Sequence, residues 1–553
     1  MTTQHPQIVV AGAGPVGTCL AIDAARRGID VVVVEPRASD DPPDAKCNTI
    51  AARTMETFRR FGIADQVRAA GLPDDYPTDT IYTTSLAGPE LTRITMPSRA
   101  ERDLPGLDGT PWHDAVWPTP EPMVRQSQLW LEPILRAQLL ALPNVRFLPR
   151  TEVVGLTQDD DGVNVHCRGL DDGQDLDLRT DYLVGCDGGS SRVRRAMGVR
   201  LAGDAEIGRT RTTLVRSAGI GALFGDRRPA WMSWVVNHRA RGNVVAIDGE
   251  ELWLVHRALP AGETDFEALD PDHSIRDVLG VDANFEFEVL KHEDWVGRRL
   301  VAERIRDRRV FLAGDAAHLW VPFAGYGMNA GIADAVNLSW LLSGVLHGWA
   351  DPGILDAYEA ERLPITDQVS RFAMAKLQEN AAAMSTRSAP RRLSSPGLVG
   401  RALRRRLGRR LLDINLAQMS PEGLNFGYYY DDSPIIVGDG EEPPGYDMGS
   451  FIPSTVPGCR LPHFRVDGVS VLDLLGPDYT LLRLDPSVEV TALSETGLPV
   501  VVVDVPGPPD PTFRHRLLIV RVDSHVVWRG DALPDDTTAL ADQLRGRRPQ
   551  EAR

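Results

Sequence analysis

At 553 residues the chain is too long for a single hydrophobic core, so we expect two or three domains. Its 60 basic and 77 acidic side chains give a formal net charge of −17, which argues against a general affinity for nucleic acid or anionic lipid. The sequence has no apolar run long enough to span a bilayer, no signal-peptide pattern, and five scattered cysteines without a C-x-x-C spacing. We therefore expect a cytoplasmic protein with no membrane anchor, no disulfide framework and no metal centre.

The first predicted element is a buried strand over 8–11 that runs directly into a glycine-rich turn. The turn has the pattern G-x-G-x-x-G, formed by Gly12, Gly14, Pro15, Val16 and Gly17. Such glycines let the backbone approach a pyrophosphate, and the N-terminus of the following helix favours an anion. Glu35 ends the next apolar run, where its carboxylate can accept hydrogen bonds from a ribose diol. The pattern predicts a dinucleotide site, with NAD and FAD both open at this point; an ordinary strand-to-helix turn is the alternative.

Periodicity and turn residues predict the elements that follow. In chain order these are a Pro- and Asp-rich excursion at 72–122, a helix at 128–142, strands at 163–167 and 182–186, a separate sheet within 201–301, a buried strand at 309–313 and a long helix at 328–346. The arginine-rich run 387–410 favours a solvated helix face over a nucleic-acid patch in so acidic a chain. From about 445 onward, strand patterns at 480–484, 500–503 and 517–522 predict a separate small α/β domain.

Two further clusters of glycine and aspartate follow buried strands. Asp187-Gly188-Gly189 comes after the strand at 182–186, and Gly314-Asp315 comes after the strand at 309–313. A simple nicotinamide dehydrogenase needs one glycine-rich turn and leaves these clusters unexplained. Together the three clusters resemble the FAD-dependent aromatic hydroxylases, the p-hydroxybenzoate hydroxylase-like flavoprotein monooxygenases. The resemblance covers nearly the whole chain.

The resemblance implies FAD as cofactor and NADPH or NADH as co-substrate. It implies that Asp187 lies near both nucleotides, that Asp315 binds hydroxyl groups of FAD, and that the backbone after Asp315 approaches the flavin ring. Arg53, Arg125 and Gln128 match family positions that contact the cofactor. The implied cofactor-binding residues are Gly12, Gly14, Pro15, Val16, Gly17, Glu35, Arg53, Arg125, Gln128, Asp187, Gly314, Asp315, Pro322, Gly325, Gly327, Met328 and Asn329.

The resemblance also implies the fold: α/β, with a Rossmann-like FAD-binding domain, an inserted β-rich substrate domain and a C-terminal thioredoxin-like domain. The expected FAD-binding parts are 1–76, 125–194 and 306–385, the substrate parts are 77–124 and 195–305, a helical linker is 386–444, and the thioredoxin-like domain is 445–553. Without a C-x-x-C the last domain cannot exchange dithiols, so we expect a packing or dimerisation element. Family habit implies a homodimer.

The implied activity is a monooxygenase that uses NAD(P)H and O2 to hydroxylate a small phenolic or aromatic substrate through a flavin C4a-hydroperoxide. Baeyer-Villiger oxygenation or epoxidation of a polycyclic natural product stays open on the same scaffold, and a non-catalytic flavin-binding assembly protein is the alternative of a different class. A flavin halogenase is disfavoured, because its W-x-W-x-I-P signature is absent. No motif identifies the catalytic base; the candidates are His238, His256, Tyr82, Arg216 and Tyr326.

Overall fold

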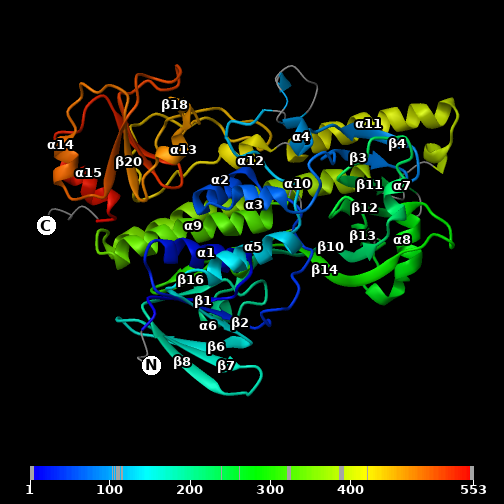
Figure 1. Cartoon of the computed structure of the whole chain (residues 1–553), viewed down its shortest axis with the longest axis horizontal. Coiled ribbons are helices and arrows are strands. Elements are labelled where there is room, and N and C mark those ends of the chain that lie inside the picture. Colours follow the sequence, from blue (N-terminus) through cyan, green and yellow to red (C-terminus); the bar gives the residue numbers. More distant parts are fainter. Residues whose placement is uncertain are drawn as a thin grey trace.

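The computed structural model describes residues 5–102, 104, 106–107, 113, 116–237, 240–260, 262–320, 325–384, 391–419 and 421–547. In Figure 1 a parallel sheet lies at the centre, a larger sheet on the right and a third sheet at the upper left, with long helices running between them. None of the helices in the described part of the chain is long and apolar enough to cross a membrane.

The first sheet is built from short apolar strands that are buried on both faces. Its order is β15-β16-β9-β1-β2-β5, with β1 Ile8–Ala11, β2 Val31–Glu35, β5 Val145–Pro149, β9 Tyr182–Gly185, β15 Arg306–Asp307 and β16 Val310–Leu312. All pairs except β15–β16 are parallel. Since parallel strands end at one edge of a sheet, the turns after β1, β9 and β16 meet there beside the end of β2. That edge carries the glycine and acidic residues singled out in the sequence.

Helices cover this sheet on both faces. They are α1 Pro15–Arg26, α2 Ala52–Phe61, α3 Ala64–Ala69, α5 Gln128–Leu140, α6 Arg192–Ala196, α9 Tyr326–Leu346 and α10 Asp356–Ala383, with 3-10 turns η3 Gly314–Ala316 and η4 Pro352–Leu355. The almost entirely buried helix α9 packs against α1 and α10. A three-stranded sheet, β6 Thr151–Gln158, β7 Val163–Gly169 and β8 Asp175–Thr180, is appended below.

The large sheet combines strands from two distant parts of the chain. Its order is β17-β14-β10-β13-β12-β11-β3-β4, with β3 Thr80–Thr83, β4 Glu90–Ile94, β10 Leu201–Arg216, β11 Met232–Val236, β12 Arg241–Ala246, β13 Leu252–Ala258, β14 Glu288–Ala302 and β17 His318–Leu319. Short helices accompany it: α4 Arg99–Arg102, α7 Gly219–Ala222, η2 Phe266–Ala268 and α8 Pro271–Leu279. Only β3 and β11 pair in parallel.

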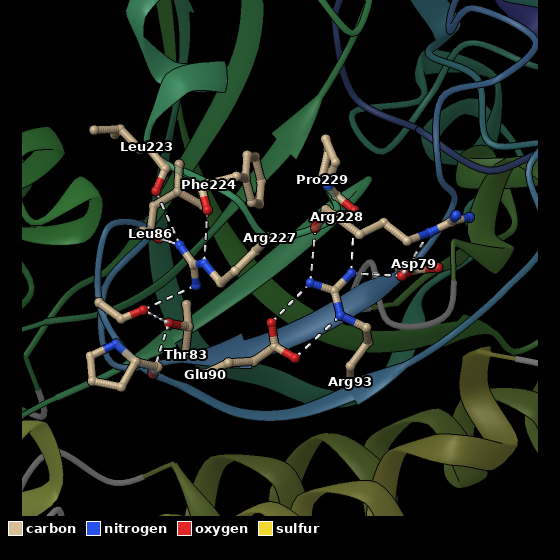
Figure 2. Close-up of polar contacts among 12 residues, drawn as sticks. Asp79, Thr83, Leu86, Glu90, Arg93, Leu223, Phe224, Arg227, Arg228 and Pro229 are labelled. Carbon is tan, nitrogen blue, oxygen red and sulfur yellow. Dashed lines mark hydrogen bonds and ion pairs between the residues drawn. The ribbon is translucent and has the colours of Figure 1, made fainter. Parts of the chain in front are cut away.

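Charged side chains tie β3 and β4 to the loop 223–229, as Figure 2 shows. Asp79, directly before β3, is fully buried, and its Oδ2 accepts a hydrogen bond from Arg93 Nη1 of β4 at 2.6 Å. Arg93 also donates to Glu90 and to backbone carbonyls of the loop. Arg227, from the loop, donates to backbone carbonyls in the turn between β3 and β4. This network holds β3 and β4 against the later strands of the sheet.

The C-terminal third begins with helices and ends in a separate sheet. The helical elements are η5 Arg391–Ser394, α11 Leu398–Met419 and α12 Glu422–Phe426; then follow β18 Arg465–Val466, β19 Val469–Ser470, α13 Val471–Leu474, β20 Tyr479–Arg483, α14 Thr491–Glu495, β21 Val500–Asp504, β22 Leu517–Arg521, β23 Val526–Gly530 and α15 Thr537–Leu544. The C-terminal sheet has the order β21-β20-β22-β23, with only β20 and β21 parallel.

A buried ion pair joins the C-terminal sheet to the helices of the first sheet. Arg521 of β22 donates to both oxygens of Glu361 of α10, at 2.6 and 3.0 Å, and both side chains are fully buried. Nearby, the ring of Tyr479 meets that of Trp340 of α9 edge-on. These contacts pack the C-terminal sheet against α9 and α10.

Candidate functional site

Gly12 and Gly17 allow backbone to pack on backbone at the end of β1. Gly12 has φ +102°, and a Cβ there would lie 2.4 Å from the carbonyl oxygen of Cys186, which follows β9. A Cβ on Gly17 would lie 2.0 Å from the carbonyl oxygen of Gly12. Both positions therefore require glycine for the fold itself.

Gly14 differs, because nothing lies within 4 Å of the place where its Cβ would be. It is the extended N-cap of α1, makes no side-chain capping bond, and is followed by Pro15 at the first helical position and Val16. The amides of the first turn of α1 thus have no capping side chain beside an open space. A helix N-terminus of this kind favours a phosphate group.

Glu35 closes the turn from the end of β2. Its side chain is only 4% exposed; Oε2 accepts from the Ala13 amide at 2.6 Å, and Oε1 accepts from the backbone and side chain of Arg37. Arg37 also donates a hydrogen bond to Glu132 at 3.1 Å, and Glu132 accepts another from Gln128 at 2.5 Å. The predicted residues Glu35 and Gln128 are therefore connected by a continuous hydrogen-bond chain.

Asp315 stands in η3, just after β16, with its carboxylate free of protein donors. The Asp315 side chain is accessible to solvent, but the surrounding protein desolvates its carboxyl group and so raises its pKa. The positive charges of His318 and Lys46 act in the opposite direction. Among the described residues no hydrogen bond to its side chain is formed. A carboxylate that is surrounded by protein and still open is placed to accept hydrogen bonds from a polyol. Lys46, which the sequence reasoning did not select, is the cation beside it.

Asp334 of α9 fixes the turn that carries Asp315. It is buried, and it accepts from the Gly314 amide at 3.2 Å and from Arg362 Nε at 2.8 Å, while His318 Nε2 lies 2.7 Å away. Burial raises its pKa, but the charges of Arg362 and His318 outweigh burial and lower it. This supporting role depends on long-range packing, so no local pattern could identify it.

The N-terminus of α9 docks on the segment 49–51. Asn329 accepts from the Ala51 amide at 2.9 Å and donates to the Thr49 carbonyl at 3.0 Å. Gly325 has φ +67°, and a Cβ there would lie 2.8 Å from Thr49 Cβ. Gly327 lies against Trp320, and Met328 packs on the main core. Pro322 lies outside the described residues.

Three further predicted cofactor residues have other partners. Asp187 accepts from the Ser191 hydroxyl and from two amides at the start of α6, which it caps. Arg125 donates to Thr49 Oγ1 at 3.1 Å and to the Met419 carbonyl at 2.9 Å. Arg53 donates to the Asp523 carbonyl at 2.8 Å and lies over the Tyr428 ring, so its guanidinium is directed toward the C-terminal sheet. A cofactor contact of Arg53 stays a prediction.

The candidate catalytic residues are scattered. Arg216 pairs with Glu288 and Glu251 at the outer end of the large sheet. The Tyr326 hydroxyl donates to the Leu424 carbonyl, and burial raises its pKa well above the usual range. Tyr82 is fully buried and stacked on Trp234, and burial raises its pKa well above the usual range as well. Neither tyrosine suits proton transfer near neutral pH. His238 lies outside the described residues.

His256 lies in the middle of a half-exposed face of the large sheet. Direct cross-strand pairing aligns a row of side chains on this face: Tyr82, Trp234, Asn243, His256, Thr212 and Glu293. The neighbouring residues on the opposite face, such as Val244 and Val255, are buried. His256 Nδ1 lies 2.7 Å from Thr212 Oγ1, and burial lowers the pKa of His256 to about 4. The ring is therefore neutral at physiological pH.

The donor set at the edge of the first sheet fits FAD. The open N-terminus of α1 suits the diphosphate, Glu35 suits a ribose, and the unpartnered carboxylate of Asp315 suits the flavin polyol. Within the described residues, no cluster of three or more His, Cys, Asp or Glu could hold a metal ion. The site is thus that of an FAD-binding flavoprotein.

Comparison with known proteins agrees with this geometry. Residues 5–373 match the FAD binding domain family. The FAD-dependent monooxygenase apdD of Emericella nidulans is 29% identical, over 95% of this chain and 88% of that protein, and the phenol 2-monooxygenase of a Pseudomonas species is 28% identical, over 98% and 92%. The solved structure of the rebeccamycin biosynthetic enzyme RebC with reduced flavin superposes with a TM-score of 0.85 at 31% identity, covering 98% of this chain and 99% of that one.

The chain therefore belongs to the FAD-dependent aromatic hydroxylase family. The predicted fold class, a Rossmann-like α/β domain with an inserted β-rich sheet, is confirmed.

Proposed function

We propose that the protein is a monooxygenase that uses FAD, NADPH or NADH, and O2 to hydroxylate a phenolic ring. The net reaction is Ar–H + O2 + NAD(P)H + H⁺ → Ar–OH + H2O + NAD(P)⁺. The observation that carries the proposal is the open carboxylate of Asp315 at the same sheet edge as Gly14 and Glu35. The relatives named FAD-dependent monooxygenase and phenol 2-monooxygenase support this reaction class.

When bound, FAD would supply the redox chemistry, that is, the oxidation of the nicotinamide and the activation of O2. The protein's own residues hold and orient the cofactor. The first turn of α1 binds the diphosphate, Glu35 and Asp315 bind hydroxyl groups, and Asn329 fixes the start of α9 against the segment 49–51.

The half-exposed face of the large sheet is the proposed wall of the substrate site. It presents aromatic and neutral polar side chains, including Trp234, Asn243 and His256. The segment 44–46 reaches this sheet through the ion pair of Asp44 with Lys291 at 2.6 Å, and Lys46 beside Asp44 also faces Asp315. One short segment thus connects the proposed flavin site to the proposed substrate wall.

The test is turnover by the purified protein loaded with FAD. A panel of single-ring phenols, hydroxyphenyl acids and fused phenols is screened with NADPH and with NADH. We expect substrate-stimulated oxidation of one nucleotide and a product heavier by one oxygen atom, with ¹⁸O incorporated from ¹⁸O2. Nucleotide oxidation that yields only hydrogen peroxide with every phenol would exclude the hydroxylase and favour a flavin-binding assembly protein.

Replacing Asp315 tests the cofactor site directly. Asp315→Asn removes the charge that accepts hydrogen bonds, and such bonds contribute about 1.5–3 kcal/mol, so we expect FAD to bind about tenfold or more weakly. FAD titration followed by flavin fluorescence measures this. Asp161→Asn, in an exposed turn, is the control and should bind FAD as the wild type does.

The proposal includes four further features of the protein. They are the dependence on a nicotinamide nucleotide, the homodimer, the cytoplasmic location and the division into FAD-binding, substrate, linker and thioredoxin-like segments.

A further inference from the structure

At the centre of the row on the half-exposed face, Thr212 is hydrogen-bonded to His256, while the other ring nitrogen of His256 and the oxygen of Asn243 have no protein partner in the part of the chain that the structure describes. Thr212 of β10 and Asn243 of β12 both pair directly with His256 of β13. Asn243 Oδ1 is buried without a hydrogen-bond partner, and no hydrogen bond to His256 Nε2 is formed within the described residues. Unpaired polar atoms inside a protein require a ligand or water.

This row lies between two helices that cover other parts of the same face. At one end, Arg299 of β14 donates to Ser370 of α10 at 3.1 Å. At the other end, Tyr82 and Trp234 pack against apolar residues of α11. The residues between, Thr212, His256 and Asn243, are only partly covered. The residues that carry the unpaired atoms therefore lie in an uncovered part of the face.

The hydrogen-bond chain defines which atom of His256 carries the proton. Trp295 Nε1, which can only donate, donates to Thr212 Oγ1 at 3.0 Å. Because the Thr212 hydroxyl has no other protein acceptor among the described residues, it is assigned as the donor to His256 Nδ1 at 2.7 Å. A neutral His256 then carries its proton on Nε2. The ring offers an N–H donor, and its low basicity excludes it as the acceptor of a phenolic proton.

The charges around the row favour an anionic oxygen. The titratable groups nearest the row are Arg241 of β12, Tyr82 of β3, and Lys291 and Glu293 of β14, with Asp44 and Lys46 in the segment beside β14. Farther out on the same face, Arg216 pairs with Glu288 and Glu251, and Arg299 pairs with Asp367. Lys291 lies 2.6 Å from Asp44 and 3.3 Å from Glu293, and Lys46 lies 2.9 Å from Asp44, so these four charges compensate one another. Half-buried Arg241, two residues before Asn243 on the same strand, makes no ion pair within the described residues, so its positive charge is uncompensated beside the row.

We propose that His256, oriented by Thr212 and Trp295, donates a hydrogen bond from Nε2 to the ring oxygen of the substrate and stabilises its phenolate form. The substrate class is a phenol whose oxygen accepts from His256 Nε2 and whose proton leaves to solvent. Asn243 Oδ1, an acceptor, pairs instead with a donor group elsewhere on the substrate or with water. This inference rests on the proposed function, which requires an electron-rich ring. It makes His256 a hydrogen-bond donor and Thr212 a positioning residue.

The test is the apparent pKa of 4-nitrophenol bound to the FAD-loaded protein, followed by the difference absorbance of the nitrophenolate. In the wild type we expect a bound pKa at least one unit below that of free 4-nitrophenol, a tenfold preference for the phenolate. His256→Phe keeps a ring but removes the donor, and should return the bound pKa to the free value. FAD content and melting temperature serve as fold controls.

Thr212 provides a matched pair. Thr212→Val keeps the shape but loses the hydroxyl, and should lose most of the shift, whereas Thr212→Ser keeps the hydroxyl and should retain it. A purely structural role of Thr212 would not make the shift follow the hydroxyl. The proposal is overturned if 4-nitrophenol does not bind, if its bound pKa is unshifted in the wild type, or if His256→Phe retains the shift.

The outcome is independent of turnover. A lowered pKa that His256→Phe abolishes, in a protein that hydroxylates no phenol, would retain this inference and reject the proposed function. Hydroxylation of a phenol by a protein in which the bound pKa of 4-nitrophenol is unshifted would support the proposed function and reject this inference.

Discussion

Gly12 and Gly14 lie two residues apart in one turn, yet an added methyl group has a different consequence at each. At Gly12 it would collide with the carbonyl oxygen of Cys186 and force an alanine to φ +102°. At Gly14 it would point into open space beside the first turn of α1. One glycine serves the fold, and the other leaves room for a ligand.

We therefore expect Gly12→Ala to lower the melting temperature of the FAD-free protein, since positive-φ strain alone costs about 1–3 kcal/mol. Gly14→Ala should leave that temperature unchanged and weaken FAD binding about tenfold or more by obstructing the diphosphate. Thermal unfolding and FAD titration check both. Gly208→Ala, in another open position, is the control. FAD binding by Gly14→Ala at wild-type affinity would contradict the assignment.

At the residue scale, the sequence predicts the positions that belong to a local motif and misses those that depend on long-range register. Gly12, Glu35 and Asp315 follow apolar strands and lie at one edge, as expected. Thr212 and Trp295 could not be selected, because only cross-strand pairing brings them to His256. Arg53 was selected as a cofactor residue, but its contact with the distant Asp523 carbonyl could not be predicted for the same reason.

At the scale of elements, the large sheet depends on Asp79, which connects β4 to the loop 223–229 (Figure 2). The carboxylate is fully buried and also accepts from the Met96 amide at 3.0 Å. Removing one partner from a buried ion pair leaves the other uncompensated. The parallel pairing of β3 with β11 is therefore sensitive to this single side chain.

Asp79→Asn should lower the free energy of unfolding by about 3 kcal/mol. Glu101→Gln is the matched control, because Glu101 also pairs with Arg228 but is more exposed, and its loss should cost less than about 1 kcal/mol. Urea unfolding followed by tryptophan fluorescence compares the two. An equal loss of unfolding free energy in both variants would mean that the burial of Asp79 does not make its ion pair more important than that of Glu101.

The elements themselves were unequally predictable. Strands β1, β2, β9 and β16 agree with the predicted apolar runs, because parallel strands buried on both faces are apolar throughout. The long strands β10 and β14 were not resolved within the predicted sheet at 201–301, since one face carries threonines and charges. In α11, Arg405, Arg406, Arg409 and Arg410 are exposed, which agrees with the predicted solvated face.

At the scale of the whole molecule, the C-terminal sheet is anchored by buried charges. Beside the Arg521–Glu361 pair, Asp523 lies 3.2 Å from His525 Nδ1, and the ring of His525 is packed against Tyr430. Burial lowers the pKa of His525 to about 3, although the nearby carboxylate opposes this. The thioredoxin likeness of this domain stays a prediction.

Acid should therefore weaken the fold through His525. Between about pH 6.5 and 3 the unfolded chain binds a proton at this residue that the folded protein does not, so stability falls as the pH decreases, by about 1.4 kcal/mol per pH unit. His525→Phe should flatten the dependence of the unfolding free energy between pH 7 and 5. His256 and His463 have lowered pKa values too, so the difference from wild type isolates His525.

Exposed His273 is the control, and His273→Asn should keep the wild-type slope. A slope unaltered by His525→Phe would show that this ring is protonated in the folded protein.

The order of strands in the first sheet has a consequence for biosynthesis. Neighbours β1, β9 and β16 come from residues 8–11, 182–185 and 310–312, and the covering helix α9 ends only at residue 346. During translation, β1 and β2 have unpaired strand edges until their partners β9 and β5 have been synthesised. Chaperones are expected to hold that nascent stage, and the flavin can join only after translation has passed α9.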